Sequence, residues 1–226
     1  MGTNLEMPSN FRIATRIAGT GLVRKYEFSR VLDITLILLA LPYIILAVCL
    51  IGILILLDSG GPVLYSQTRI GKNGNKFKLY KFRTMAQNAD QILHAYLETS
   101  PALKSEWLAT HKLQNDPRIT RLGALLRKTS LDELPQLWNI FIGDMSIVGP
   151  RPIVDAEVEK YGACFDLYKQ VRPGLTGLWQ VSGRSDTSYQ RRVELDEYYV
   201  CNRSLKLDLQ ILWKTVFVVL RKKGAY

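Results

Sequence analysis

The longest hydrophobic run in the chain extends from Ile34 to Leu57, 24 residues without a charged side chain. As a helix this run would be about 36 Å long at 1.5 Å per residue, enough to cross the hydrocarbon core of a bilayer. It is too long and too far from the N-terminus for a signal-peptide core, and a Gly-Gly-Pro turn follows it where a cleavage site would stand. The pattern therefore predicts a retained membrane segment, which we place at residues 29–58.

Positive charges flank this segment on both sides. The flanking basic residues are Arg12, Arg16, Arg24, Lys25 and Arg30 before it, and Arg69, Lys72, Lys76, Lys78, Lys81 and Arg83 after it. Because Lys and Arg favour the cytoplasmic side of a membrane, both ends favour the same face. Two arrangements stay open: a helix that enters the bilayer, bends at Pro42 and returns, or an ordinary span with a proline kink. Residues 1–28 are expected to be flexible or to lie on a surface.

Behind the membrane segment, the polarity pattern predicts a mixed domain over residues 59–226. Two stretches, 61–67 and 76–83, predict a β-hairpin, and we interpret the basic side chains of the second strand as sharing one face. Helical patterns cover 86–110, 119–128, 154–170, 188–202 and 205–220. The last of these has a wide apolar face, which predicts either a core helix or an amphipathic helix in the bilayer interface. The expected fold class is α+β and mostly helical.

The charge of the chain narrows its possible partners. The net charge is +10, and residues 1–83 carry +7 of it, from 11 basic and 4 acidic residues. Such a basic front half favours an anionic surface, either nucleic acid or lipid headgroups. The apolar run and the lack of a recognisable nucleic-acid motif favour lipid, so no nucleic-acid partner is expected. Three widely separated cysteines exclude a disulfide scaffold and a cysteine zinc site.

The candidate chemistry lies at two adjacent carboxylates, Asp132 and Glu133. Such a pair after a serine is usually a helix N-terminus, here with Ser130 as the cap. Shortly afterwards, the glycines and prolines of residues 143–152 present Arg151 from a rigid loop, and a fixed guanidinium suits bidentate phosphate binding. Carboxylates and arginines beside a membrane suggest phosphoryl chemistry, in which a carboxylate coordinates Mg²⁺ or attacks phosphorus itself.

These residues belong to longer stretches that resemble the bacterial sugar transferase family, the monotopic phosphoglycosyl transferases. The stretches are SRVLD at 29–33, GPVLYSQTRIGKNGNKFKLYKFRTM at 61–85, NDPRITRLGALLRKTSLDELPQLWNIFIGDMSIVGPRP at 115–152, VRPGLTGLWQVSGRS at 171–185 and ELDEYYVCNRSLKLDLQIL at 194–212. The resemblance implies that a UDP-hexose, with galactose or glucose, and undecaprenyl phosphate react to give undecaprenyl-diphospho-hexose and UMP. This reaction begins exopolysaccharide synthesis.

The resemblance also implies roles for individual residues. Asp132 would be the nucleophile, would carry a covalent phosphosugar intermediate and would contact Mg²⁺, while Glu133 would assist proton transfer. Arg151 matches the family's phosphate-binding arginine, and Arg127 matches a further arginine of the active site. In the second predicted strand, 76–83, Lys81 and Arg83 are expected to face the diphosphate of the substrate.

The family enters the membrane as a re-entrant hairpin and stays on the cytoplasmic face of the inner membrane, which agrees with the two basic flanks. One feature departs from the family pattern. Members usually carry Ser-Pro about thirteen residues after the Asp that opens the hydrophobic run, whereas here Asp33 is followed by Pro42, about one helical turn earlier. From the residues alone, a non-enzymatic membrane-anchored adaptor, with Asp132 and Glu133 as helix caps only, stays open as an alternative.

Overall fold

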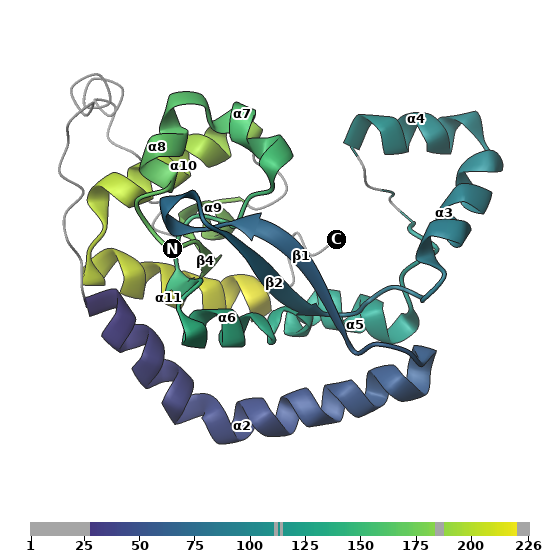
Figure 1. Ribbon diagram of the computed structural model, residues 1–226, viewed down its shortest axis with the longest axis horizontal. Coiled ribbons are helices and arrows are strands. Elements are labelled where there is room, and N and C mark those ends of the chain that lie inside the picture. Colours follow the sequence, from purple (N-terminus) through teal and green to yellow (C-terminus); the bar gives the residue numbers. More distant parts are fainter. Residues whose placement is uncertain (1–27, 111–112, 114, 184–187, 221–226) are drawn as a thin grey trace.

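The computed structural model describes residues 28–110, 113, 115–183 and 188–220 (Figure 1). The prediction for residues 1–28 falls outside this description, except that Phe28 begins the first described helix. The described part of the chain is mostly helical and contains two two-stranded sheets, which confirms the α+β class. Helices α3 and α4 extend away from the remaining elements. Helix α2 runs along one side of the main group of elements.

The predicted membrane segment forms one helix, α2 (Phe28–Ser59), with Pro42 inside it. Figure 1 shows α2 changing direction along its length, as expected where a proline removes a backbone hydrogen bond and clashes with the preceding turn. The helix ends at Ser59 because Gly60 and Gly61 adopt positive φ angles of 57° and 62°. Among the described residues, α2 is the one helix long and apolar enough to span a membrane, and 11% of its most apolar stretch is buried.

The first part of α2 is fixed to the rest of the chain by polar contacts. Asp33 is 2% exposed and accepts hydrogen bonds from the hydroxyl of Ser146 (2.8 Å) and the backbone amide of Ile147 (2.9 Å). Arg30 donates to the backbone carbonyl of Phe141 (2.7 Å). These bonds join the start of α2 to β3 (Ser146–Val148) and α6 (Gln136–Ile142).

The second part of α2 is fixed by apolar packing. Ile51 and Ile55 are 6% and 1% exposed and lie in one buried cluster with Phe82 and Leu126. Burying an aliphatic or aromatic side chain of this size contributes about 1.5–3 kcal/mol. Both parts of the helix therefore contact the same body, while the middle of the helix exposes its largest side chains, Tyr43 among them at 77%.

The predicted hairpin is confirmed. Strands β1 (Leu64–Ile70) and β2 (Lys76–Phe82) pair antiparallel around a turn that contains the 3₁₀ helix η2 (Lys72–Gly74). The interpretation that the basic residues of β2 share one face is wrong. Lys76 and Lys78 are exposed, whereas Lys81 has the same parity along the strand as the buried Phe77 and Leu79. The sequence changes phase at Tyr80, so Lys81 projects from the opposite face to Lys78.

The longer helices follow the predicted ranges, with breaks at proline and glycine. Helices α5 (Arg121–Thr129), α10 (Tyr189–Asn202) and α11 (Leu205–Leu220) confirm three predicted helices. The stretch 86–110 divides into α3 (Ala89–Glu98) and α4 (Pro101–Thr110), because proline begins a helix and does not continue one. The stretch 154–170 divides into η4 (Asp155–Glu157), α7 (Val158–Tyr161), η5 (Gly162–Cys164) and α8 (Phe165–Tyr168), with a positive φ of 50° at Gly162.

The pattern did not predict the second sheet, in which β3 pairs parallel with β4 (Gly174–Thr176). Strands of three residues are too short to show an alternation of polarity. The loop between Val148 and Arg151 lies directly against this sheet, because a side chain on Gly174 would place its Cβ 2.1 Å from the backbone nitrogen of Gly149. Glycine at this position lets the two backbones approach closely.

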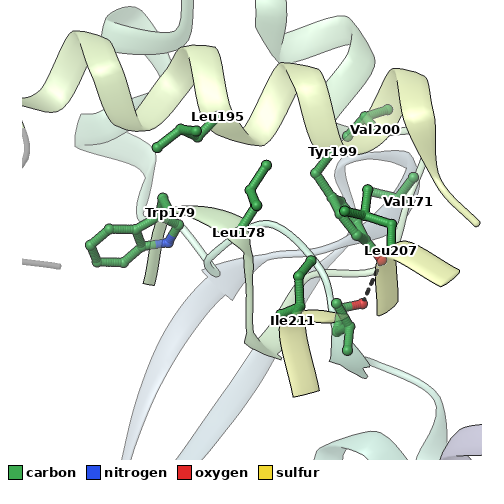
Figure 2. Close-up of a cluster of buried hydrophobic side chains, with 9 residues drawn as sticks. Val171, Leu178, Trp179, Leu195, Tyr199, Val200, Leu207 and Ile211 are labelled. Carbon is green, nitrogen blue, oxygen red and sulfur yellow. Dashed lines mark hydrogen bonds between the residues drawn. The ribbon is translucent and has the colours of Figure 1, made fainter. Parts of the chain in front are cut away.

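The largest core cluster joins α10, α11 and the short helix α9 (Leu178–Val181). Figure 2 shows these side chains converging, and the hydroxyl of Tyr199 donates to the carbonyl of Val148 (3.2 Å). Helix α11 takes part through Leu207 and Ile211, which are 7% and 0% exposed. Its other face exposes Leu209, Trp213 and Phe217, so α11 is apolar on two sides.

Candidate active site

Helix α5 precedes the acidic pair in the chain and packs directly on the backbone that follows β2. A Cβ on Gly123 would lie 2.0 Å from the carbonyl oxygen of Thr84, so only glycine permits this approach. The hydroxyl of Thr120 caps the helix by accepting from the amide of Gly123 (2.9 Å). The carboxylate of Asp116, before the helix, forms an ion pair with Arg118 (2.6 Å).

The acidic pair follows a sharp reversal at the end of α5. Ser130 adopts a left-handed conformation (φ 58°), and its side chain makes no capping hydrogen bond. Ser130 therefore occupies the N-cap position before the acidic pair, as interpreted, but caps it without a side-chain hydrogen bond, and the same residue ends α5. A left-handed serine is an uncommon, strained conformation of the kind found at functional sites. It leads directly into η3 (Leu131–Glu133), which carries both carboxylates.

The two carboxylates have different partners. Glu133 accepts from the ammonium group of Lys81 (2.6 Å), and both side chains are about 30% exposed. Asp132 is half-buried, and burial raises its pKa to about 6, while the charges of Lys81 and Arg127 act in the opposite direction. Asp132 is thus mostly ionised at neutral pH, in a region that still penalises its charge.

Arg127 supports this arrangement from α5. Its Nε donates to the hydroxyl of Thr84 (2.9 Å). Burial lowers the pKa of Arg127, and the neighbouring Asp132 raises it. The structure therefore brings three of the predicted residues, Lys81, Arg127 and Glu133, around Asp132 from three different elements, β2, α5 and η3.

Two other predicted residues lie in different surroundings. Arg83 donates to the backbone carbonyl of Gly60 and to the hydroxyl of Ser59 (2.8 Å), which joins it to the end of α2. Arg151 is half-buried, with its guanidinium 5.7 Å from the ring centroid of Trp179. Their contacts with a diphosphate stay predictions. Sequence reasoning gave no role to Trp179, because a tryptophan in an apolar stretch is more often part of the core.

The described residues contain no group of three or more His, Cys, Asp or Glu side chains that could hold a metal ion. Mg²⁺ commonly binds one or two carboxylates together with substrate phosphates and water, so it does not need such a group. The half-buried carboxylate of Asp132 is a donor of this kind, whereas Glu133 is occupied by Lys81. The residues present fit an ion shared with the substrate, and the role of Asp132 as its ligand stays a prediction.

Comparison with known proteins identifies the family of this chain. A family model described as bacterial sugar transferase matches residues 24–222, so the chain belongs to the bacterial sugar transferase family, which confirms the resemblance found in the sequence. The exopolysaccharide production protein ExoY of Sinorhizobium fredii is 49% identical over 87% of this chain and 87% of its own length.

Two further relatives are longer proteins. The UDP-galactose-lipid carrier transferase of Erwinia amylovora is 48% identical over 89% of this chain, and the undecaprenyl-phosphate galactose phosphotransferase of Salmonella typhimurium is 53% identical over 74% of it. The chain spans 41% and 35% of these two relatives, respectively.

Proposed function

We propose that this chain transfers a hexose-1-phosphate, galactose or glucose, from a UDP-hexose to undecaprenyl phosphate and releases UMP, as the first step of exopolysaccharide assembly. The observation that carries this proposal is the ionised, half-buried Asp132 between two cations, in a member of a sugar transferase family. Lys81 and Arg127 lie where negative charge develops when phosphate groups meet a carboxylate.

The reaction proceeds in two displacements. A carboxylate oxygen of Asp132 attacks the β-phosphorus of the UDP-hexose; the bond from that phosphorus to the bridging oxygen breaks, and UMP leaves with the oxygen. The phosphosugar is then an acyl phosphate on Asp132. An oxygen of undecaprenyl phosphate attacks the same phosphorus, the acyl phosphate bond breaks and the carboxylate is restored. Covalent capture means that the two substrates need not occupy the site together.

Glu133 assists these steps as an acid–base group. Glu133 accepts the proton of the lipid phosphate before its attack, and Lys81 fixes the orientation of this carboxylate. Asp132 would hold a Mg²⁺ ion together with the donor, and the bound ion would neutralise part of the phosphate charge. Arg151 holds a phosphate group of the donor from the loop after β3.

The membrane helix supports a re-entrant topology on the cytoplasmic face of the inner membrane. Residues near both ends of α2 contact the domain that follows it. Asp33 accepts a hydrogen bond from Ser146, and Ile55 packs with Phe82. A true span would separate these ends by roughly 30 Å of hydrocarbon. A helix that bends near Pro42 keeps both ends on one side, and its exposed middle, with Leu39 and Tyr43, enters the bilayer.

The acidic pair, Asp132 and Glu133, then lies beside the lipid. Leu126 of α5 packs on Ile55 of α2, and the acidic pair follows a few residues after it. We infer that the exposed apolar face of α11, with Trp213 and Phe217, lies in the bilayer interface as predicted for the last helix. This arrangement places a soluble nucleotide and a lipid phosphate at one headgroup plane.

The activity is tested with purified protein in nanodiscs, undecaprenyl phosphate, Mg²⁺ and a panel of UDP-hexoses. We expect UMP release with UDP-galactose or UDP-glucose, and label trapped on Asp132 by acid quenching when the lipid is omitted. Absence of UMP release with every donor would favour the membrane-anchored adaptor. A rate law that requires both substrates bound together would contradict the covalent intermediate.

The topology is tested in a variant without Cys49, Cys164 and Cys201. Single cysteines placed before residue 30 and after residue 60 should react with a membrane-impermeant reagent from the same side, and one at Leu39 should be protected. Reaction from opposite sides would mean that α2 spans the membrane.

A further inference from the structure

A second group of charged side chains lies at the other end of the hairpin from Lys81. It consists of Arg69 at the end of β1, Arg151 after β3 and Arg192 in α10. Arg69 and Arg192 each place an Nη1 atom 3.8 Å from a carboxylate oxygen of Glu157, and their side chains are 13% and 11% exposed. Three arginines from separate parts of the chain therefore converge in a largely buried place.

Two of these arginines lie close to one indole ring. The guanidinium carbons of Arg192 and Arg151 lie 4.8 Å and 5.7 Å from the ring centroid of Trp179. Burial and the charge of Arg151 lower the pKa of Arg69. The guanidinium groups are thus close enough to repel one another, and nearby acids offset this only in part, because Glu157 is shared and the pKa of buried Asp196 is raised to about 7.

Several donors in this group have no acceptor. Nε of Arg69, Nε and Nη2 of Arg192, and Nε1 of Trp179 are buried and find no hydrogen-bond partner among the described residues. Buried donors without a partner are rare in native proteins, and each calls for an explanation such as an absent ion. The acceptor that matches several guanidinium N–H groups at once is a phosphate oxyanion.

The hairpin connects this place to the acidic pair. Its register pairs Arg69 with Phe77 and Tyr65 with Lys81, so Arg69 and Lys81 project from the same face. Along β2, Phe77 and Lys81 are four residues apart, or about 13 Å at 3.3 Å per residue. The guanidinium of Arg69 donates to Oε1 of Gln67 (2.6 Å), a residue two positions nearer to Lys81 in the register, which shortens the gap that a diphosphate has to bridge. In Figure 1, α7, α8 and α10 lie on the opposite side of the hairpin from most of α2, while Phe77, the register partner of Arg69, packs in one buried cluster with Ile37 of α2.

We propose that Arg69, Arg151, Arg192 and the indole N–H of Trp179 form a subsite that binds the phosphate of the uridine nucleotide, the part of the donor that leaves as UMP. This inference rests on the proposed function and adds Arg69, Arg192 and Trp179 to the binding residues expected from the family. The lipid phosphate offers the same oxyanion chemistry, so the test below distinguishes the two sources.

The test measures UMP binding by calorimetry with the full chain in nanodiscs. Arg192→Gln and Arg69→Gln should each weaken UMP binding at least about ten-fold, since each removes charge-assisted hydrogen bonds to the phosphate. Arg191→Gln is the matched control, because Arg191 is adjacent on α10 but pairs with Glu194 at the exposed surface (2.9 Å), and it should leave UMP binding unchanged. In the transfer reaction, the KM for UDP-hexose should rise while the KM for undecaprenyl phosphate stays constant.

Three results would overturn the proposal: unchanged UMP affinity in folded Arg69→Gln and Arg192→Gln proteins, a rise in the lipid KM instead of the donor KM, or displacement of UMP by inorganic phosphate at equal concentration. Arg192→Lys, which keeps the charge but not the planar fork, carries the test if Arg192→Gln does not fold. If no UDP-hexose is turned over but the variants still lose UMP binding, the subsite stands and the proposed reaction fails.

Discussion

Two aspartates, Asp132 and Asp196, show how differently the same side chain is used in this molecule. Burial raises the pKa of both, to about 6 for Asp132 and about 7 for Asp196. Asp196 is 2% exposed in the middle of α10 and accepts a hydrogen bond from the hydroxyl of Tyr161 (2.7 Å). Asp132 is half-buried on a short 3₁₀ turn, and the described residues give its carboxylate no side-chain hydrogen bond.

A raised pKa therefore does not by itself identify a reactive carboxylate. A nucleophile needs an available lone pair and an approach for phosphorus, whereas a structural acid needs its oxygens bonded inside the protein. Asp132 meets the first description because cations surround it without binding it directly. Asp196 is closer to the second, since its Oδ2 accepts a hydrogen bond from a tyrosine of α7.

The largest expected effect separates these two roles directly. Asp132→Asn should lower the transfer rate at least about a thousand-fold without unfolding the protein, because the amide cannot form the acyl phosphate. Asp196→Asn should lower it less than about ten-fold, since the amide still accepts from Tyr161. UMP release and thermal melting measure the two effects. Comparable rates for Asp132→Asn and the unaltered protein would remove Asp132 as nucleophile.

The pH dependence of the reaction gives a smaller but sharper effect. Since Asp132 must be ionised to attack, kcat/KM should fall about ten-fold per pH unit below pH 6 and level off above it. Lys81→Met should move this limb to higher pH, because the charge of Lys81 favours the ionised form. Stopped assays at saturating Mg²⁺ measure the limb. A profile that stays flat down to pH 5 would contradict the assignment.

The smallest effect concerns stability. The pKa of Asp196 in the folded protein lies above its unfolded value of about 4, so its contribution to stability is fully present below pH 4 and is lost as pH rises through about 7. Asp196→Asn should remove this loss, which amounts to up to about 1.4 kcal/mol per pH unit in that window. Melting temperatures from pH 5 to pH 8 measure it. Asp166→Asn is the control, since its side chain is 83% exposed, and an identical profile for both variants would contradict the prediction.

Much of the fold could be predicted from the sequence, because local rules decide it. The membrane helix follows from a charge-free run, the hairpin from short alternating segments around a glycine turn, and α10 and α11 from helical periodicity. The breaks at Pro101 and Gly162 divided two predicted helices, and the three-residue strands β3 and β4 left no periodic signal.

The candidate site likewise has one part that the sequence predicts and one part that it does not. The sequence by itself determined the acidic pair, the membrane helix and the resemblance to a sugar transferase family, since each depends on neighbouring residues. Only the tertiary structure decided which cations meet the acidic pair and that Arg151 and Arg192 converge on Trp179. These depend on long-range packing: glycines such as Gly123 let backbones touch, and such contacts join residues far apart in the chain.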